Sequence, residues 1–253
     1  MIYTGIDLGS RFIKVLSFKD GSFKKQLYDT VTFYKKHIHR DGEKVSLVLE
    51  GLEGGLLATG YGRNLLSFDN VTVISEIKAH FYGAREQTKE ENFVLVDVGG
   101  QDCKVIEVRD GFINDFTMND KCAASTGRFM EQAAGVLEIP LEELQKATQN
   151  PLTLSDTCAV FCESEMIGHL AKGAHDLELA AGVNLAVAKR LAPQIKRYRP
   201  NTVYTSGGAA SYGLSYFLSE LIGVEIFPLK ESQFNGALGA AVYLKMKAGG
   251  LNV

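Results

Sequence analysis

The chain has almost no net charge, only four cysteines and no long apolar run. Its 27 lysines and arginines against 30 aspartates and glutamates give a net charge of −3, so nothing global indicates a nucleic-acid or membrane-surface partner. No apolar stretch approaches the ~20 residues that span a bilayer. The N-terminus enters a strand pattern directly and shows no signal-peptide pattern. What remains is an ordinary globular composition, 45% hydrophobic and 23% charged, whose 253 residues accommodate one large domain or two modest lobes.

The scarcity of cysteine without a secretory signal indicates a reducing compartment. In such a compartment thiols bind metals or take part in chemistry more often than they form disulfides. We therefore expect a cytoplasmic protein.

An internal repeat organises the chain. Residues 6–21 read IDLGSRFIKVLSFKDG and residues 96–111 read VDVGGQDCKVIEVRDG. At a constant offset the identical pairs are Asp7/Asp97, Gly9/Gly99, Lys14/Lys104, Val15/Val105, Asp20/Asp110 and Gly21/Gly111. Each copy predicts a strand, a tight D-x-G turn, a second strand, an Asp-Gly hairpin turn and a third strand. The repeat predicts two similar lobes, one made of residues 1–91 with about 234–253 and the other of residues 92–233.

The rest of the pattern predicts alternating strands and helices. In the first lobe we expect strands over 26–34, 44–49, 56–58 and 71–74 and a helix over 75–90. In the second lobe we expect helices after Ser125 or Thr126, over 141–149, after the cap residues 155–157, over 177–198 and over 213–221, and strands over 202–206 and 224–228. Asn235 is expected to cap a small-residue helix. His37 and His39 fall on one face of a predicted strand, and an exposed strand face explains them better than a metal pair.

The two D-x-G turns carry the features of a phosphate site. Glycine lets the backbone approach a phosphate, and successive N–H groups form an anion-binding concavity. An aspartate beside phosphates requires an intervening Mg²⁺ or water. Two such turns facing each other across a cleft would bind the β- and γ-phosphates, with Asp7 holding hydrated Mg²⁺ and Asp97 orienting an attacking water. Gly207-Gly208 would let a nucleoside lie against the backbone, so nucleotide binding is favoured over turns that merely end strands.

The duplicated hairpins, the T-S-G-G at 205–208 and the small-residue helix from 235 resemble the superfamily of actin, Hsp70 and sugar kinases. The resemblance implies an α/β, duplicated ribonuclease H-like two-lobe fold with an ATP cleft. Within the superfamily, N-D-K-C-A-A-S-T-G-R-F at 119–129 and T-C-A-V-F-C-E-S-E at 157–165 are similar to activator ATPases of 2-hydroxyacyl-CoA dehydratases and benzoyl-CoA reductases. The matching segments cover nearly the whole chain.

This resemblance implies an ATPase coupled to electron transfer, with ATP/ADP, Mg²⁺ and one [4Fe–4S] cluster bridging a homodimer. Cys122 and Cys158 fall on the family's two ligand positions. Both are predicted at helix starts, which favour thiolates, and two thiolates per chain supply four ligands only in a two-fold dimer. Reduced ferredoxin or flavodoxin would be the electron donor. The acceptor would be an iron–sulfur dehydratase or a related reductase such as a double-cubane protein.

The site residues that we expect divide into three groups. Those expected to act in catalysis are Asp7, Asp97 and Gln101. Those expected to bind the nucleotide are Gly9, Ser10, Arg11, Lys14, Gly99, Gly100, Asp102, Thr126, Gly127, Gly207, Gly208, Gln233 and Gly236. Those expected to bind metal are Cys122 and Cys158 for the cluster and Asp7 for Mg²⁺ through water. Arg11-Phe12-Ile13 is bulkier than the family's usual residues there.

Other interpretations remain open. Cys103 and Cys162 are best explained as packed side chains. Cys122, Cys158, Cys162 and His169 have the ligand types of a zinc site, which would make the protein a zinc-stabilised regulatory ATP-binding dimer. A sugar-type kinase of the same fold would need a general base and a substrate pocket, and would have no need for Cys122 and Cys158.

Overall fold

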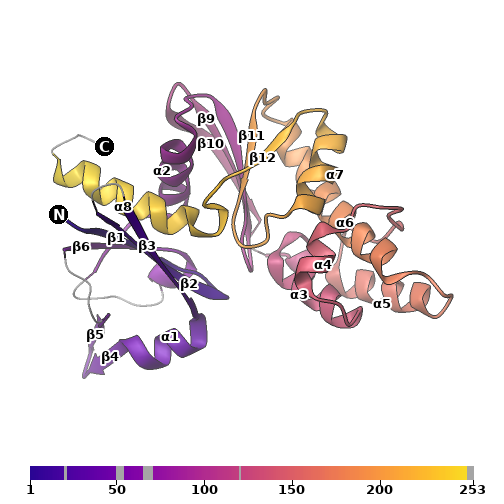
Figure 1. Cartoon of the computed structure of the whole chain (residues 1–253), viewed down its shortest axis with the longest axis horizontal. Helices are drawn as coiled ribbons and strands as arrows, with labels where there is room; N and C mark the ends of the chain where they lie inside the picture. The colour runs from indigo at the N-terminus through magenta and orange to yellow at the C-terminus, as the bar shows by residue number, and fades with distance from the viewer. Residues whose placement is uncertain (20–21, 50–53, 65–70, 120, 250–253) are drawn as a thin grey trace. The chain divides into compact units, whose positions relative to one another are not determined.

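The computed structural model describes residues 1–19, 22–49, 54–64, 71–119 and 121–249 (Figure 1). The chain forms two compact units, the first made of Met1–Lys89 with Gln233–Val253 and the second of Glu90–Ser232. Each unit is built on one five-stranded sheet. Within the described ranges no helix combines the length and the apolar character that crossing a bilayer requires.

The sheet of the first unit has the strand order β3-β2-β1-β6-β7. Its strands are β1 (Tyr3–Leu8), β2 (Phe12–Lys19), β3 (Ser22–Asp29), β6 (Gly55–Thr59) and β7 (Thr72–Val73). β1, β2 and β3 pair antiparallel, whereas β6 and β7 continue from β1 in parallel. The unit also contains the small hairpin of β4 (Ile38–Asp41) and β5 (Lys44–Leu47), the 3-10 helix η1 (Tyr61–Asn64) and helices α1 (Thr30–His37), α2 (Glu76–Thr88) and α8 (Asn235–Ala248).

The alternation of side chains along β1 divides the first unit into two layers. Ile6 and Leu8 point into a core with Phe33 of α1, while Asp7 points to the opposite face. α8 contacts β1 and packs along α2 (Figure 1). Gly239 makes the contact between the two helices close, because a Cβ there would lie 1.7 Å from the Ala79 carbonyl oxygen.

The sheet of the second unit repeats this order as β10-β9-β8-β11-β12. Its strands are β8 (Phe93–Val98), β9 (Cys103–Arg109), β10 (Phe112–Asn119), β11 (Val203–Ser206) and β12 (Ile226–Pro228). The first three pair antiparallel in a meander, and β11 and β12 continue in parallel from β8. The helices of the unit are η2 (Ala123–Ser125), α3 (Gly127–Val136), α4 (Leu141–Lys146), α5 (Ala159–Leu170), α6 (Asp176–Lys196) and α7 (Tyr212–Ile222), and η3 (Ser232–Phe234) leads into α8. The duplicated α/β fold is confirmed.

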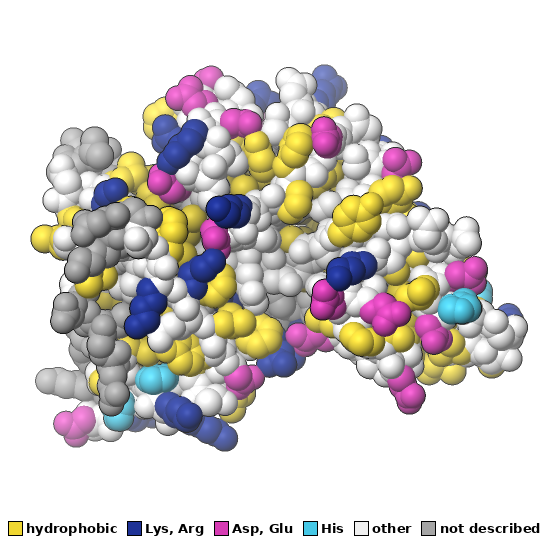
Figure 2. Space-filling view, viewed as in Figure 1, with side chains coloured by type: hydrophobic (Ala, Val, Ile, Leu, Met, Phe, Trp, Pro, Cys, Tyr) yellow, Lys and Arg dark blue, Asp and Glu magenta, His cyan; other side chains and the backbone are white. Residues whose placement is uncertain are grey.

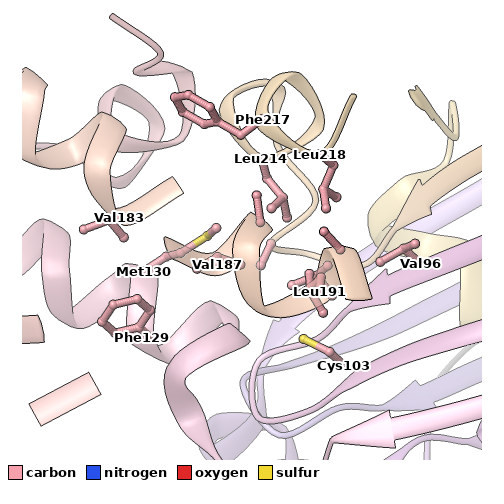
Figure 3. Packing of buried hydrophobic residues seen from close by; sticks show 14 of the residues in the cluster. Val96, Cys103, Phe129, Met130, Val183, Val187, Leu191, Leu214, Phe217 and Leu218 are labelled. Carbon is pink, nitrogen blue, oxygen red and sulfur yellow. The ribbon is translucent and has the colours of Figure 1, made fainter. Parts of the chain in front are cut away.

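The core of the second unit lies between its sheet and helices α3, α6 and α7. Figure 3 shows Val187 and Leu191 of α6 among side chains of the neighbouring elements, including Val96 of β8, Met130 of α3 and Leu214 of α7. α6 is apolar on most of its surface because it is enclosed by other elements on several sides. Burial of each large aliphatic side chain contributes about 1.5–3 kcal/mol. The helix passes through Pro193 and ends at Lys196, two residues before the predicted end at 198.

Three predictions of local structure are wrong, one of a strand and two of helix caps. Residues 30–37 form α1 instead of extending a strand to 34, because Asp29 caps the helix by accepting a hydrogen bond from the Thr32 N–H at 3.0 Å. His37 therefore ends a helix and does not share a strand face with His39 of β4. The N-cap of α5 is Cys158, one residue after the expected cap residues. Asn235 is the first residue of α8 and its side chain bonds elsewhere.

One further difference concerns the end of a predicted helix, and two predicted features fall outside the described residues. α4 ends at Lys146, three residues earlier than the pattern predicts. The first Asp-Gly pair of the repeat, at 20–21, and Asp120 of the cysteine motif lie outside the described residues.

Candidate functional site: two aspartate turns and a pair of cysteines

The first aspartate turn follows β1 in the first unit. Asp7 is buried, and its carboxylate lies 3.0 Å from the Nζ of Lys14, its register partner on β2. Gly9 allows the chain to turn tightly here, because a Cβ would lie 2.6 Å from the Phe12 carbonyl oxygen. Arg11 bonds to Asp29 at 2.8 Å, and its guanidinium lies over the Phe12 ring.

A second loop of the first unit reaches the same carboxylate. Thr59 ends β6 opposite Asp7 in the parallel register, and Gly60 follows it with φ +96°. A Cβ at position 60 would lie 2.5 Å from Oδ1 of Asp7, so only glycine fits against the carboxylate in this backbone conformation. The Thr59 hydroxyl is buried and has no hydrogen-bond partner among the described residues. Buried polar atoms are normally satisfied, so this one indicates an oxygen ligand or water beside Asp7.

The second unit repeats this arrangement around Asp97. Lys104 Nζ lies 2.8 Å from the Asp102 carboxylate and 3.5 Å from that of Asp97. Ser206, at the end of β11, donates a hydrogen bond of 2.8 Å to Oδ1 of Asp97. Gly207 follows with φ +95°, and a Cβ there would lie 2.9 Å from the same oxygen. The buried carboxylate is thus surrounded by one cation, one hydroxyl and a bare backbone.

The structure extends the repeat beyond the segments that sequence alone aligned. Thr59-Gly60 in the first unit and Ser206-Gly207 in the second occupy equivalent places, each at the end of the strand parallel to the aspartate strand. In each pair a small hydroxyl residue is followed by a glycine with positive φ. Sequence reasoning missed Thr59 and Ser206. The available signal was a small hydroxyl residue followed by glycine, after a strand, in both halves.

The glycines of the second turn are tied to the start of α3. The N–H of Gly127 donates to the Gly99 carbonyl oxygen at 2.9 Å, and the N–H of Arg128 donates to that of Gly100 at 3.0 Å. The Thr126 hydroxyl donates to the carbonyl oxygen of Ala123 at 2.8 Å. The predicted nucleotide ligands Thr126 and Gly127 therefore lie beside the second turn, and these bonds fix its shape.

The segments that carry Cys122 and Cys158 approach each other. Cys122 contacts Thr157, the residue before Cys158, which lies 35 residues further along the chain. Each cysteine occupies the N-cap position of the helix that follows it, η2 and α5, and each is half-buried. The Sγ of Cys122 lies 3.9 Å from the carbonyl oxygen of Thr157, the residue before Cys158. Arg190 of α6 donates to the same carbonyl oxygen at 3.4 Å and to that of Asp156 at 3.2 Å. Arg190 is a residue that sequence reasoning missed.

The other two cysteines are different in environment. Cys103 and Cys162 are buried, and burial raises the pKa of each thiol to about 12. The Cys103 thiol donates to the carbonyl oxygen of Ser125. Among the residues that the structure describes, no three His, Cys, Asp or Glu side chains are grouped to hold a metal ion, so the four-residue zinc site is not assembled within one chain.

The remaining predicted residues have defined positions in the fold, but none of their described contacts indicates that they bind a nucleotide or a metal. Ser10 lies in the turn between β1 and β2, Gln101 and Gly208 lie in the two turns of the second unit, and Gln233 lies in η3. Gly236, the second residue of α8, lies next to Asp7, because a Cβ at this position would be 3.5 Å from the Asp7 carboxyl carbon. The roles of all these residues stay predictions.

Comparison with known proteins decides the family. Residues 4–243 match the profile of the BadF/BadG/BcrA/BcrD ATPase family. The chain belongs to this family. It is 39% identical over 259 residues to the (R)-2-hydroxyglutaryl-CoA dehydratase activating ATPase of Acidaminococcus fermentans, covering 98% of each chain. The resemblance inferred from the motifs is therefore confirmed, and the chain is an ATPase.

Solved structures agree with this assignment. The activator of 2-hydroxyisocaproyl-CoA dehydratase from Clostridium difficile, solved with bound ADPNP, superposes with a TM-score of 0.83 at 31% identity, covering 100% of this ATPase and 99% of that chain. A ROK family glucokinase from Streptomyces griseus superposes with a TM-score of 0.57 at 11% identity, covering 95% and 98%. The second likeness shows only that the fold is shared with sugar kinases.

Proposed function

We propose that this ATPase is an electron-transfer activator, a homodimer whose single bridging [4Fe–4S] cluster delivers low-potential electrons to a partner iron–sulfur enzyme. The observation that carries the proposal is the convergence of Cys122 on the peptide before Cys158. The Cys122 thiol reaches the residue before Cys158, and these two are the half-buried cysteines of the chain, whereas Cys103 and Cys162 are buried. A cubane cluster requires four cysteine ligands, which a second copy of the chain would complete.

The chemistry around the two cysteines fits such a cluster. Cys158 is the N-cap residue of the twelve-residue helix α5, whose N-terminus favours negative charge. Arg190 places a cation at the carbonyl oxygen that Cys122 also approaches. In these surroundings Cys122 and Cys158 would hold the group as thiolates. When bound, the cluster would accept and release one electron.

The surface beside Cys158 supports a dimer. Val160 and Phe161 in the first turn of α5 are each 64% exposed, and Ile167 is 53% exposed. Figure 2 shows apolar side chains among acidic ones over the α3 and α5 region. Large exposed apolar residues in one helix are typical of a protein interface. We propose that a second copy covers them, so that α5 of each copy adjoins the shared cluster.

Each of the two aspartate turns is proposed to take part in binding the magnesium nucleotide. Asp7, with the Thr59 hydroxyl and the Gly60 backbone beside it, offers oxygen atoms to hydrated Mg²⁺. Asp97 is held by Ser206 and Lys104, which suits it to orient an attacking water, with Gln101 adjacent. The nucleotide-binding roles predicted above for the glycines and their neighbours belong to this proposal. The ADPNP bound to the related activator supports it.

A route from nucleotide to cluster runs through the start of α3. The carbonyl groups of Gly99 and Gly100 are bonded to the first N–H groups of α3, and Cys122 precedes that helix by five residues. Asn119 donates to the Cys122 carbonyl oxygen at 3.0 Å and to the Ser125 hydroxyl at 3.0 Å, so the intervening loop is also held. A change in the second turn would therefore displace the Cys122 segment. ATP drives such a change only if its affinity differs between the two states.

The partners follow from this function. Reduced ferredoxin or flavodoxin would supply the electron, and an iron–sulfur dehydratase or related reductase would accept it. Relatives are named as activators of dehydratases and as a benzoyl-CoA reductase subunit. Cluster ligation requires reduced thiolates, so the proposal includes a cytoplasmic location.

Anaerobic purification tests the proposal. We expect a dimer with about four irons and matching sulfide, a brown colour and the EPR signal of a reduced cubane cluster. Cys122→Ser should lose the iron, whereas Cys162→Ala, which alters a buried thiol in α5, should keep it. Stoichiometric zinc, or a colourless monomer that phosphorylates a sugar, would contradict the proposal.

A further inference from the structure

Helices α2 and α8 of the first unit share a buried chain of amide and imidazole groups. Gln87 Nε2 donates to the carbonyl oxygen of Gly83 at 3.3 Å and to Asn235 Oδ1 at 2.9 Å. Asn235 Nδ2 in turn donates to the carbonyl oxygen of His80 at 3.0 Å and lies 3.3 Å from His80 Nδ1. Asn235 and His80 are both buried. No role predicted from the sequence uses His80.

These contacts fix the tautomer of His80. The carbonyl oxygens of Gly83 and His80 can only accept, so they identify the amide nitrogens of Gln87 and Asn235 as the donors. Asn235 Nδ2 is then also the donor toward His80, and Nδ1 must accept with its lone pair. A neutral imidazole whose Nδ1 accepts carries its proton on Nε2. With one nitrogen used as acceptor and the other protonated, His80 has no lone pair left for a metal.

The protonated edge of the ring and the Asp7 carboxylate both lie near Gly236. A Cβ at position 236 would lie 3.1 Å from His80 Nε2 and 3.5 Å from the Asp7 carboxyl carbon, so both groups border the same point. Gly236 leaves that point empty because it has no side chain. Thr59, opposite Asp7 on β6, has a buried hydroxyl for which the described residues provide no hydrogen-bond partner. An N–H donor and a carboxylate thus border one point, and a residue with a buried hydroxyl lies opposite that carboxylate in the sheet.

We propose that His80 is a positioning residue of the nucleotide site, donating its Nε2–H to a magnesium-bound water beside Asp7. The inference rests on the proposed binding of a magnesium nucleotide at Asp7. Gln87 and Asn235 act through the ring by holding its orientation and tautomer. The expected consequence is that His80 contributes to binding of the magnesium complex and not to binding of the metal-free nucleotide.

Isothermal titration of the purified full-length protein tests this with ADP, once with Mg²⁺ and once with a chelator. His80→Leu removes the donor at similar bulk, and His80→Gln keeps an N–H₂ donor near the position of Nε2. We expect His80→Leu to weaken magnesium–ADP binding roughly tenfold, the size of one hydrogen bond to a charged complex. His80→Leu should bind metal-free ADP as tightly as the unaltered protein does. His80→Gln should retain most of the affinity for magnesium–ADP. His39→Leu, an exposed histidine of the same unit, is the matched control.

A second measurement needs no nucleotide. Imidazole nitrogen NMR of the unliganded protein should show one histidine with Nε2 protonated and Nδ1 unprotonated, and this resonance should be missing in His80→Gln. The opposite tautomer at His80 would overturn the inference, as would equal losses with and without Mg²⁺ or an unchanged His80→Leu. If the unaltered protein fails to bind magnesium–ADP, the proposed function and this inference fail together. If the unaltered protein binds magnesium–ADP and the His80 variants bind it equally well, the inference fails and the proposed function stands.

Discussion

Replacing Gly239 by alanine should force helices α2 and α8 apart and destabilise the first unit. The new methyl group would lie 1.7 Å from the carbonyl oxygen of Ala79 and 2.6 Å from the amide nitrogen of Gly83. Both are backbone atoms, so no side-chain rotation relieves the contact and one helix must move. Overpacking of a tight contact costs about 1–3 kcal/mol and sometimes more, and this contact falls at the upper end.

The expected net effect is a loss of about 2 kcal/mol in the free energy of unfolding. Alanine offsets part of the strain, since it is favoured over glycine in a helix by about 1 kcal/mol. For a chain of this length, about 2 kcal/mol lowers the melting temperature by roughly 4–8 °C. Thermal unfolding of the nucleotide-free protein, followed by circular dichroism and repeated in urea, measures the change.

Gly135→Ala in α3 is the matched control. Gly135 is exposed, and a Cβ there would meet nothing within 4 Å. Only the gain in helix propensity remains, so this variant should be more stable by up to about 1 kcal/mol. The two substitutions are chemically identical and should have opposite signs. A Gly239→Ala protein as stable as the unaltered protein would refute the close helix contact.

Three other outcomes are expected. In the metal-free protein at pH 7.5, iodoacetamide should label Cys122 and Cys158 and spare Cys103 and Cys162. The pKa of about 12 keeps the two buried groups as unreactive thiols until the pH rises far above neutrality, and mass spectrometry of peptides measures the labelling. Lys104→Met should cost about 3–5 kcal/mol in urea unfolding, because it leaves buried carboxylates without their cation, and Lys14→Met should cost less since its pair is more exposed. Arg190→Ala should release the loop before Cys158 and lower the iron content of the anaerobic protein, and undiminished iron would count against its role.

The repeat made most of the fold predictable. Each copy encodes a strand, a turn and a strand within sixteen residues, so local alternation and glycine placement suffice to predict both antiparallel meanders. α1 was not predictable in the same way. Its sequence follows a strand without a break, and the decisive element is Asp29, whose side chain caps the helix only once the chain has turned. A cap residue inside a continuous polar–apolar pattern gives little local signal.

The missed parts of the candidate site are those built by contacts distant in sequence. Asp7 was predicted from its own turn, but Thr59 reaches it only through pairing of β1 with β6. Asn235 at a helix start is typical of a cap, yet its side chain bonds to His80, 155 residues away. The local sequence around Asn235 is compatible with a helix cap and with a bond to a distant residue. Only the packing of α8 on α2 decides that its side chain bonds to His80.

The order of the units along the chain has a consequence for synthesis. The second unit is continuous, whereas the first consists of two segments that lie at opposite ends of the sequence. During translation, domains fold as they emerge, so residues 90–232 can complete their core while the first sheet still lacks α8. The cysteine-bearing unit is therefore assembled before the Asp7 turn acquires Gly236 and Asn235. A chain truncated before residue 235 and released from the ribosome should contain a folded second unit and an incomplete first unit.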